Sequence, residues 1–206
     1  ILYLNQTAST KAQALQNEAA ILMTTHLPPN LPEQENAEGL YRGASLIFES
    51  DDAFQGFLQD NANPFADPIT EEDITFLTRH TETLDLLRQA ATRPVCRFTR
   101  DYSRPSVDMH LPEMQFFRNA ARILAVSAHY QASVGNMPAA LRDVSSIMKM
   151  SLHASSEPIL ISGLTGLSID GLAINALSDI LPFIDTDALS LLKRDDIHNF
   201  LFTPPS

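Results

Sequence analysis

The sequence has little cysteine and little positive charge. Cys96 is the only cysteine among 206 residues, which excludes an intrachain disulfide and a metal site built from several cysteines. Only three residues are Lys, and 25 acidic residues outnumber 14 basic ones, so the net charge is −11. A field of this sign repels phosphate backbones, and no basic stripe with interleaved aromatic residues offsets it. We therefore predict that the protein does not bind nucleic acid.

Motifs of known chemistry are also missing. The six histidines are spread along the chain, and no two of them stand at ligand spacing on one helix face. The glycines Gly163 and Gly166 do not belong to a phosphate-binding loop, because no Lys follows them in the required position. We therefore predict neither a bound metal nor a cofactor.

The sequence does contain helical periodicity over most of its length. Apolar residues recur at three to four positions in stretches that predict helices over 11–26, 37–49, 52–59, 70–91, 112–134, 138–154, 158–184 and 188–200. Thr70 and Asp73 match a capping box, and Pro112 suits the first position of a helix that Gly135 and Asn136 end. The pattern predicts an all-α fold of about seven to eight helices, stacked as antiparallel hairpins in a single domain over 1–206.

The predicted helix over 158–184 is apolar nearly all round. Its length suits a membrane span, but Asp170, Asp179 and three glycines favour a buried core helix instead. Within a core, the carboxylate of Asp170 has to be paired or protonated. We expect it to accept hydrogen bonds from an arginine, and the alternative is that it marks a binding site.

The segment 93–111 has no helical period and contains two prolines, so we predict a long loop there. Four of the eleven arginines lie in this loop, namely Arg93, Arg97, Arg100 and Arg104. Guanidinium groups at this density can clamp an anion, or they can pin the loop to the helices by internal ion pairs. We favour the internal role. The binding candidates are Arg97, Arg100, Arg104 and Asp170.

The same loop holds residues that could serve an enzyme. Cys96 could act as a nucleophile with neighbouring arginines stabilising its thiolate, although no nucleophile motif surrounds it. Asp108, His110 and Glu113 crowd at the junction of loop and helix, where a His–carboxylate pair can move protons. We favour the structural interpretation, with Cys96 buried and inert and His110 solvated.

The hairpin over 124–150 resembles a tetratricopeptide (TPR) repeat. Its turn and second helix carry the spacing of that repeat at Gly135, Asn136, Ala140, Leu141 and Asp143. The first helix departs from the repeat, since Leu124 stands where an aromatic residue is expected. The resemblance implies TPR-like helical hairpins that stack and leave a concave face for a partner.

A looser resemblance covers more of the chain. The order of segments 35–44, 93–98, the hairpin at 135–136, and 157–162 is similar to that in a group of uncharacterised bacterial proteins. Those proteins have helical-repeat character and often an N-terminal membrane segment. The resemblance implies an extracytoplasmic, periplasmic location, with residues 1–4 as the end of a membrane anchor before Ile1. A cytoplasmic location stays open.

These features predict a non-enzymatic protein-interaction module, or an accessory subunit of a membrane-associated assembly, whose partner is another protein. The alternative is a small-ligand binder or hydrolase with its site between the loop 93–111 and the helix 158–184. The two hypotheses differ in where Cys96, His110, Glu113 and Asp170 lie. An enzyme brings such residues together in one pocket, and an interaction module does not.

Overall fold

The computed structural model describes residues 13–15, 17–18, 21, 31–65, 68–99, 111–157 and 159–184. Residues 13–15, 17–18 and 21 are helical and fall within the predicted helix over 11–26. The predicted helix over 188–200 and the apolar residues 1–4 lie outside the described residues.

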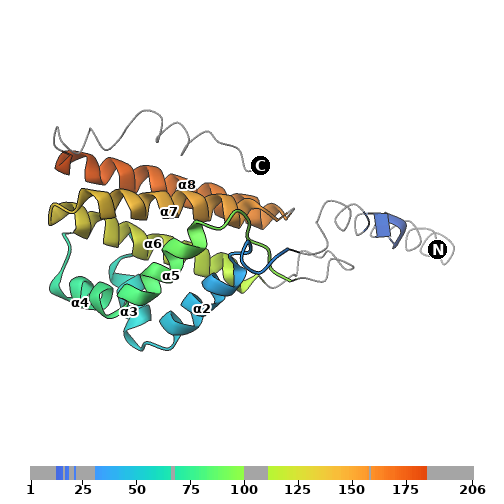
Figure 1. The fold of residues 1–206 in the computed structure, drawn as a ribbon, viewed down its shortest axis with the longest axis horizontal. Coiled ribbons are helices and arrows are strands. Elements are labelled where there is room, and N and C mark those ends of the chain that lie inside the picture. The colour runs from blue at the N-terminus through green and yellow to red at the C-terminus, as the bar shows by residue number, and fades with distance from the viewer. Residues whose placement is uncertain are drawn as a thin grey trace, which may run out of the picture.

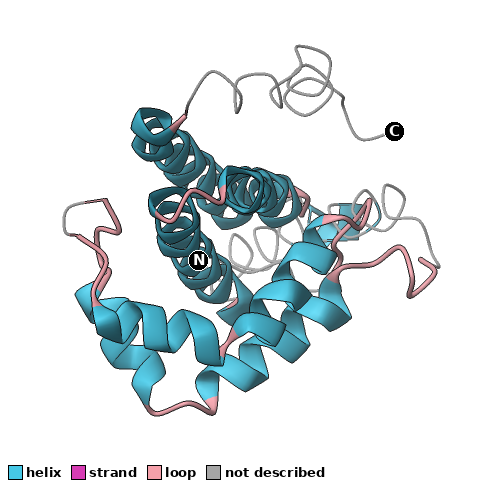
Figure 2. Ribbon diagram, turned by 60° about the vertical axis from the view of Figure 1, so that its left-hand side comes forward, coloured by secondary structure: helices cyan, strands magenta, loops and turns pink. Residues whose placement is uncertain are grey.

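Every regular element in the described residues is a helix, which confirms the all-α prediction. The three longest run side by side (Figure 1), namely α6 (Pro112–Ser133), α7 (Met137–Ser155) and α8 (Leu160–Ile180), with a short turn η1 (Leu181–Phe183) after α8. The shorter helices group apart from them (Figure 2), namely α2 (Glu38–Glu49), α3 (Ala53–Asp60), α4 (Glu71–Arg79) and α5 (Thr81–Ala91). α5 packs on α7, and α3 and α4 pack on α6, whereas α8 packs on α6 and α7 from the other side (Figure 1).

The core lies around α6. Phe117, Ile123, Leu124 and Val126 of this helix are completely buried. Tyr41 of α2 packs edge-on against Phe117, with 4.8 Å between the ring centroids. The long and the short helices therefore share one cluster of buried apolar side chains.

Local signals start and end the helices where predicted. Thr70 Oγ1 accepts from the Asp73 N–H at 3.1 Å, and the Asp73 carboxylate accepts from the Thr70 N–H at 2.9 Å, so the capping box is confirmed. Pro112 is the first residue of α6. Gly135 has a φ of 80°, which a residue with a side chain rarely adopts, and it turns the chain from α6 into α7.

The prediction of one continuous helix over 70–91 is wrong, because the helix divides at His80 into α4 and α5. The His80 ring is buried against Phe48 and Phe76, with centroid distances of 4.9 and 4.5 Å. Its Nε2 lies 2.8 Å from Asp51 Oδ2. The break coincides with contacts to residues distant in the chain, and such contacts override local helical preference.

The prediction that the helix 158–184 is a buried core helix holds for only one of its faces among the described residues. The face of α8 toward α6 and α7 carries mainly small residues, such as Ser162, Gly166, Ala173 and Ala176. Ile169 and Ile180 are also buried on this face, whereas Leu160, Leu164, Leu167 and Ile174 lie on the opposite face and are exposed. The stretch Leu160–Phe183 is long and apolar enough to cross a membrane, but a single helix of this kind is weak evidence for a span.

Candidate functional site

The start of the predicted loop 93–111 is fastened to the start of α2. Asn36 Nδ2 donates to the Arg97 carbonyl, and Asn36 Oδ1 accepts from the Arg97 N–H, each at 2.9 Å. The Ala37 N–H donates to the Val95 carbonyl, also at 2.9 Å. Arg97 is therefore held through its backbone, and its side chain is half-buried.

A buried polar cluster ties the same segment to α2 and α7. His153 Nε2 lies 3.0 Å from the Arg93 carbonyl oxygen, and His153 Nδ1 lies 2.9 Å from the Tyr41 hydroxyl. Because a carbonyl can only accept, Nε2 carries the proton and Nδ1 accepts from the Tyr41 O–H. Burial lowers the pKa of His153 to about 4 and raises the pKa of Tyr41 well above its usual value. Both groups are neutral at neutral pH, so the cluster has a structural role.

We expect the stability of the protein to fall as the pH drops from 6.5 to about 4, because His153 then gains a proton in the unfolded chain and not in the folded one. A shift of roughly 2.5 pH units corresponds to about 3 kcal/mol. His153→Gln removes this titration and keeps a side-chain N–H for the Arg93 carbonyl. Urea unfolding at neutral pH and at about pH 4 should show the native protein losing about 3 kcal/mol more than the variant. Equal losses in the two proteins would contradict a buried, neutral His153.

The candidates from the sequence are not brought together by the described part of the chain. Cys96 is 3% exposed, and its carbonyl accepts from the Ser156 hydroxyl at 2.9 Å. Glu113 lies in the first turn of α6. Asp170 is exposed on α8, so the prediction of a buried, paired carboxylate is wrong. Four further candidates lie outside the described residues, namely Arg100, Arg104, Asp108 and His110.

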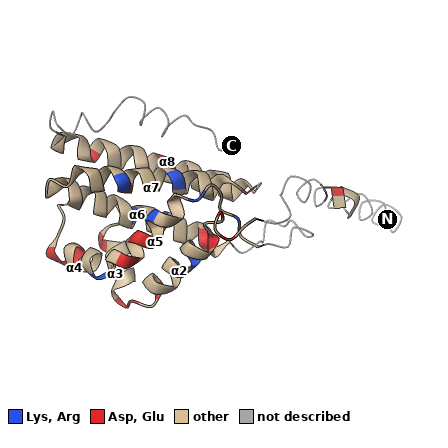
Figure 3. Cartoon of the chain, in the orientation of Figure 1, with Lys and Arg blue, Asp and Glu red and all other residues tan. Residues whose placement is uncertain are grey.

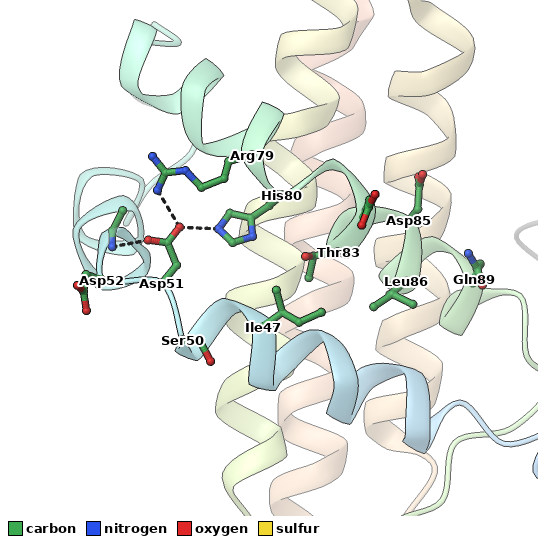
Figure 4. A pocket seen from close by; sticks show the side chains of 12 residues that line it. Ile47, Ser50, Asp51, Asp52, Arg79, His80, Thr83, Asp85, Leu86 and Gln89 are labelled. Carbon is green, nitrogen blue, oxygen red and sulfur yellow. Dashed lines mark hydrogen bonds and ion pairs between the residues drawn. The ribbon is translucent and has the colours of Figure 1, made fainter.

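A hollow surface lies instead between α2 and α5 (Figure 4). It is an open groove of about 1040 Å³, which also extends over the turn between α2 and α3 and the break between α4 and α5. Ile47 of α2 and Leu86 of α5 give it an apolar strip. Carboxylates surround this strip, namely Asp51, Asp52, Glu82 and Asp85. Arg79 is the one Lys or Arg among the lining residues, so the groove is acidic.

Asp51 organises the end of the groove where these two turns lie. Its Oδ2 accepts from Arg79 Nη1 at 2.9 Å and from His80 Nε2 at 2.8 Å, and its Oδ1 accepts from the Ala53 N–H at 2.9 Å. These hydrogen bonds, led by that from the Ala53 backbone, lower the pKa of Asp51 to about 2. Asp51 is therefore ionised at neutral pH, and its carboxylate is already hydrogen-bonded to other groups of the protein.

Two carboxylates of the groove are open to a partner. Within the described chain no hydrogen bond or ion pair engages the side chain of Asp52 or Glu82. Acidic residues gather along α2 to α5, whereas α8 carries only Asp170 and Asp179 (Figure 3). The groove thus lies on the more acidic side of the molecule, where the electrostatic field attracts cationic groups.

No known protein family, curated protein or solved structure matches the chain. The chemistry of the groove therefore follows from its own residues. Carboxylates bind guanidinium and ammonium groups through charge-assisted hydrogen bonds, and an apolar strip between them binds an aliphatic side chain. Among the described residues, no three His, Cys, Asp or Glu side chains form a group that could hold a metal ion.

Part of this groove is visible in the sequence as two pairs of acidic residues. The predicted helices alone did not show that these pairs come together. Asp51 and Asp52 directly follow one helix, and Glu82 and Asp85 are three residues apart on another. Such acidic residues on helix surfaces are common and indicate no site by themselves. Only the packing of α2 against α5 brings the two pairs to one groove.

Proposed function

We propose that the protein is a non-enzymatic interaction module that binds a basic, partly apolar segment of a partner protein in the groove between α2 and α5. The observation that carries the proposal is the lining of the groove, where an apolar strip lies among carboxylates of which Asp52 and Glu82 are unengaged in the described chain. Lys or Arg side chains of the partner would pair with these carboxylates. An apolar side chain between them would cover Ile47, which is 45% exposed.

The TPR-like spacing of the α6–α7 hairpin supports the same proposal. Stacked helical hairpins offer concave surfaces to extended or helical segments of other proteins. The alternative of a ligand-binding or hydrolytic site between the loop 93–111 and α8 has less support, because Cys96 is buried and Asp170 is exposed.

The test is a fluorescence-anisotropy titration of the full chain with a labelled peptide in which pairs of Lys alternate with Leu. A matched peptide with Glu in place of Lys serves as the negative control. We expect the basic peptide to bind and the acidic peptide not to bind. Glu82→Lys places a cation in the groove and should weaken binding of the basic peptide about tenfold or more.

Asp170→Lys is the matched control variant, because it makes the same charge change at an exposed position on α8. It should alter the affinity by less than about twofold, since a distant exposed charge is screened. Equal losses in the two variants would show that the peptide responds only to net charge, and the groove would be excluded as the site. Binding in the groove should also weaken with added salt.

From the resemblance to bacterial helical-repeat proteins, we further propose that the domain works in the periplasm as part of a membrane-associated assembly. A fusion of the full-length gene product to alkaline phosphatase tests the location, because this reporter folds only outside the cytoplasm. An inactive fusion that accumulates to normal levels would exclude the periplasm.

A further inference from the structure

The exposed face of α8 has a regular spacing. Seven positions follow one another at alternating steps of four and three residues, namely Leu160, Leu164, Leu167, Gly171, Ile174 and Ser178 of α8 and Leu181 at the start of η1. All seven are exposed, and together they form the outer seam. A spacing of this kind is the heptad pattern of helices that pair with another helix.

The outer seam holds the most exposed apolar side chains of α8. Leu160 is 80% exposed and Leu167 is 71% exposed. A single exposed Leu needs no explanation, but a continuous apolar row along a whole helix is typical of an interface. The Ser178 hydroxyl already donates to the Ile174 carbonyl at 2.9 Å, so covering the seam leaves this donor satisfied.

We infer that the outer seam pairs with the outer seam of a second copy of this chain, in antiparallel orientation, to form a symmetric dimer. The alternation of large and small residues from Leu167 to Leu181 carries this inference. With the two-fold axis between positions 172 and 173, Leu167 lies level with Ser178 of the second copy, and Gly171 lies level with Ile174 of the second copy. Leu164 lies level with Leu181 of the second copy. At the centre of the seam each large side chain therefore meets a small one, so the two helix axes can approach closely there.

A parallel pair does not fit the seam. Each residue would then meet its own copy, so Gly171 would face Gly171 and Ser178 would face Ser178 between layers of Leu and Ile. Such layers leave gaps in which the surrounding side chains lose contacts. The antiparallel pair is also isologous, which is the commonest arrangement in soluble homodimers.

Charge selects the register of the antiparallel pair. Asp170 is the exposed charged residue beside the seam, and α8 contains no Lys or Arg. An axis at position 169 would bring two Asp170 carboxylates together, which is unfavourable. An axis between positions 172 and 173 instead brings Asp170 level with Asn175 of the second copy.

The dimer goes beyond the proposed function and does not depend on it. The groove lies between α2 and α5, and the outer seam lies on the other side of the α6–α7 pair, so both grooves of a dimer stay open. A partner with two basic segments would then bind with increased avidity. If the basic peptide does not bind, the inference of a dimer still stands. If the protein is a monomer, its groove can still bind the peptide.

Sedimentation equilibrium of the full chain is the first test, with an expected mass of twice the 22.7 kDa monomer. Leu167→Glu places two carboxylates in the seam and should weaken association about a hundredfold or more. Leu46→Glu is the control, because Leu46 on α2 is similarly exposed at 62%, and it should leave the dimer intact. Added salt should strengthen the dimer, because both chains carry −11, whereas it weakens peptide binding in the groove.

Engineered cysteines test the orientation. Leu167→Cys combined with Ser178→Cys should give a covalent dimer on mild oxidation. Cys96 is kept in every variant, because its side chain is buried. Leu167→Cys alone should not cross-link, because the two positions lie about 16 Å apart along an antiparallel pair. Cross-linking of Leu167→Cys alone would overturn the antiparallel arrangement. A native protein that stays monomeric at all concentrations would overturn the dimer, and residues 185–206, a lipid bilayer or another protein would then cover the seam.

Discussion

Replacing Arg88 with Met should destabilise the fold by about 3 to 5 kcal/mol, because it leaves a buried carboxylate without its ionic partner. Arg88 Nε donates to Asp143 Oδ1 at 2.6 Å, and Arg88 Nη2 donates to Asp143 Oδ2 at 3.1 Å. The Ser127 hydroxyl donates to Oδ2 at 2.6 Å. Asp143 is completely buried, and burial raises its pKa although Arg88 and Ser127 oppose this shift. Without Arg88, the ionised carboxylate would depend on one hydroxyl.

Two further variants separate this buried pair from surface charge. Arg88→Met combined with Asp143→Leu removes both partners and should recover most of the lost stability. Asp85→Asn removes only the exposed ion pair of Arg88 with Asp85, at 2.7 Å, and should cost less than about 1 kcal/mol. Urea unfolding of the four proteins measures these differences. An Asp85→Asn variant as unstable as Arg88→Met would contradict the importance of Asp143.

The pH dependence of the Arg88→Met variant gives an independent check. Burial already raises the pKa of Asp143 in the native fold, and we expect this variant to raise it further, because Arg88 no longer opposes the shift. Protonation therefore favours the folded state as the pH falls. We expect the stability difference between the native protein and Arg88→Met to be smaller in acid than at neutral pH.

The sequence predicted those features that depend on neighbouring residues. The capping box of Thr70 and Asp73, the start of α6 at Pro112 and the turn at Gly135 are each encoded within a few residues. Such local preferences act in the same way wherever the segment stands in the fold. The helices and the all-α class follow from them.

Features that depend on distant contacts could not be predicted from the sequence. The break at His80 coincides with a contact to Asp51, which lies 29 residues earlier. The TPR-like spacing included Asp143, but its partner Arg88 lies 55 residues away on α5. The groove requires α2 to lie against α5. α8 has apolar residues on both of its faces, so the sequence did not show which face packs against the other described helices.

Gly166→Ala should destabilise the protein by about 1 to 3 kcal/mol, because it overpacks the contact between α7 and α8. A Cβ atom at Gly166 would lie 2.7 Å from Ser155 Cβ and 2.8 Å from the Ser151 carbonyl oxygen. The second of these atoms belongs to the backbone of α7 and cannot rotate away. α8 would therefore have to move off α7, which loosens the packing of Ile169 and Ala173 on the same buried face.

Gly163→Ala is the matched control on the same helix. A Cβ atom at Gly163 would meet nothing within 4 Å, so the higher helix propensity of Ala should stabilise the protein by up to about 1 kcal/mol. Urea unfolding should thus move the two midpoints in opposite directions, and a shift in the same direction would contradict close packing at Gly166. Opposite shifts would also explain the small residue at position 166, because the close approach of α8 to α7 at this point leaves no room for a side chain.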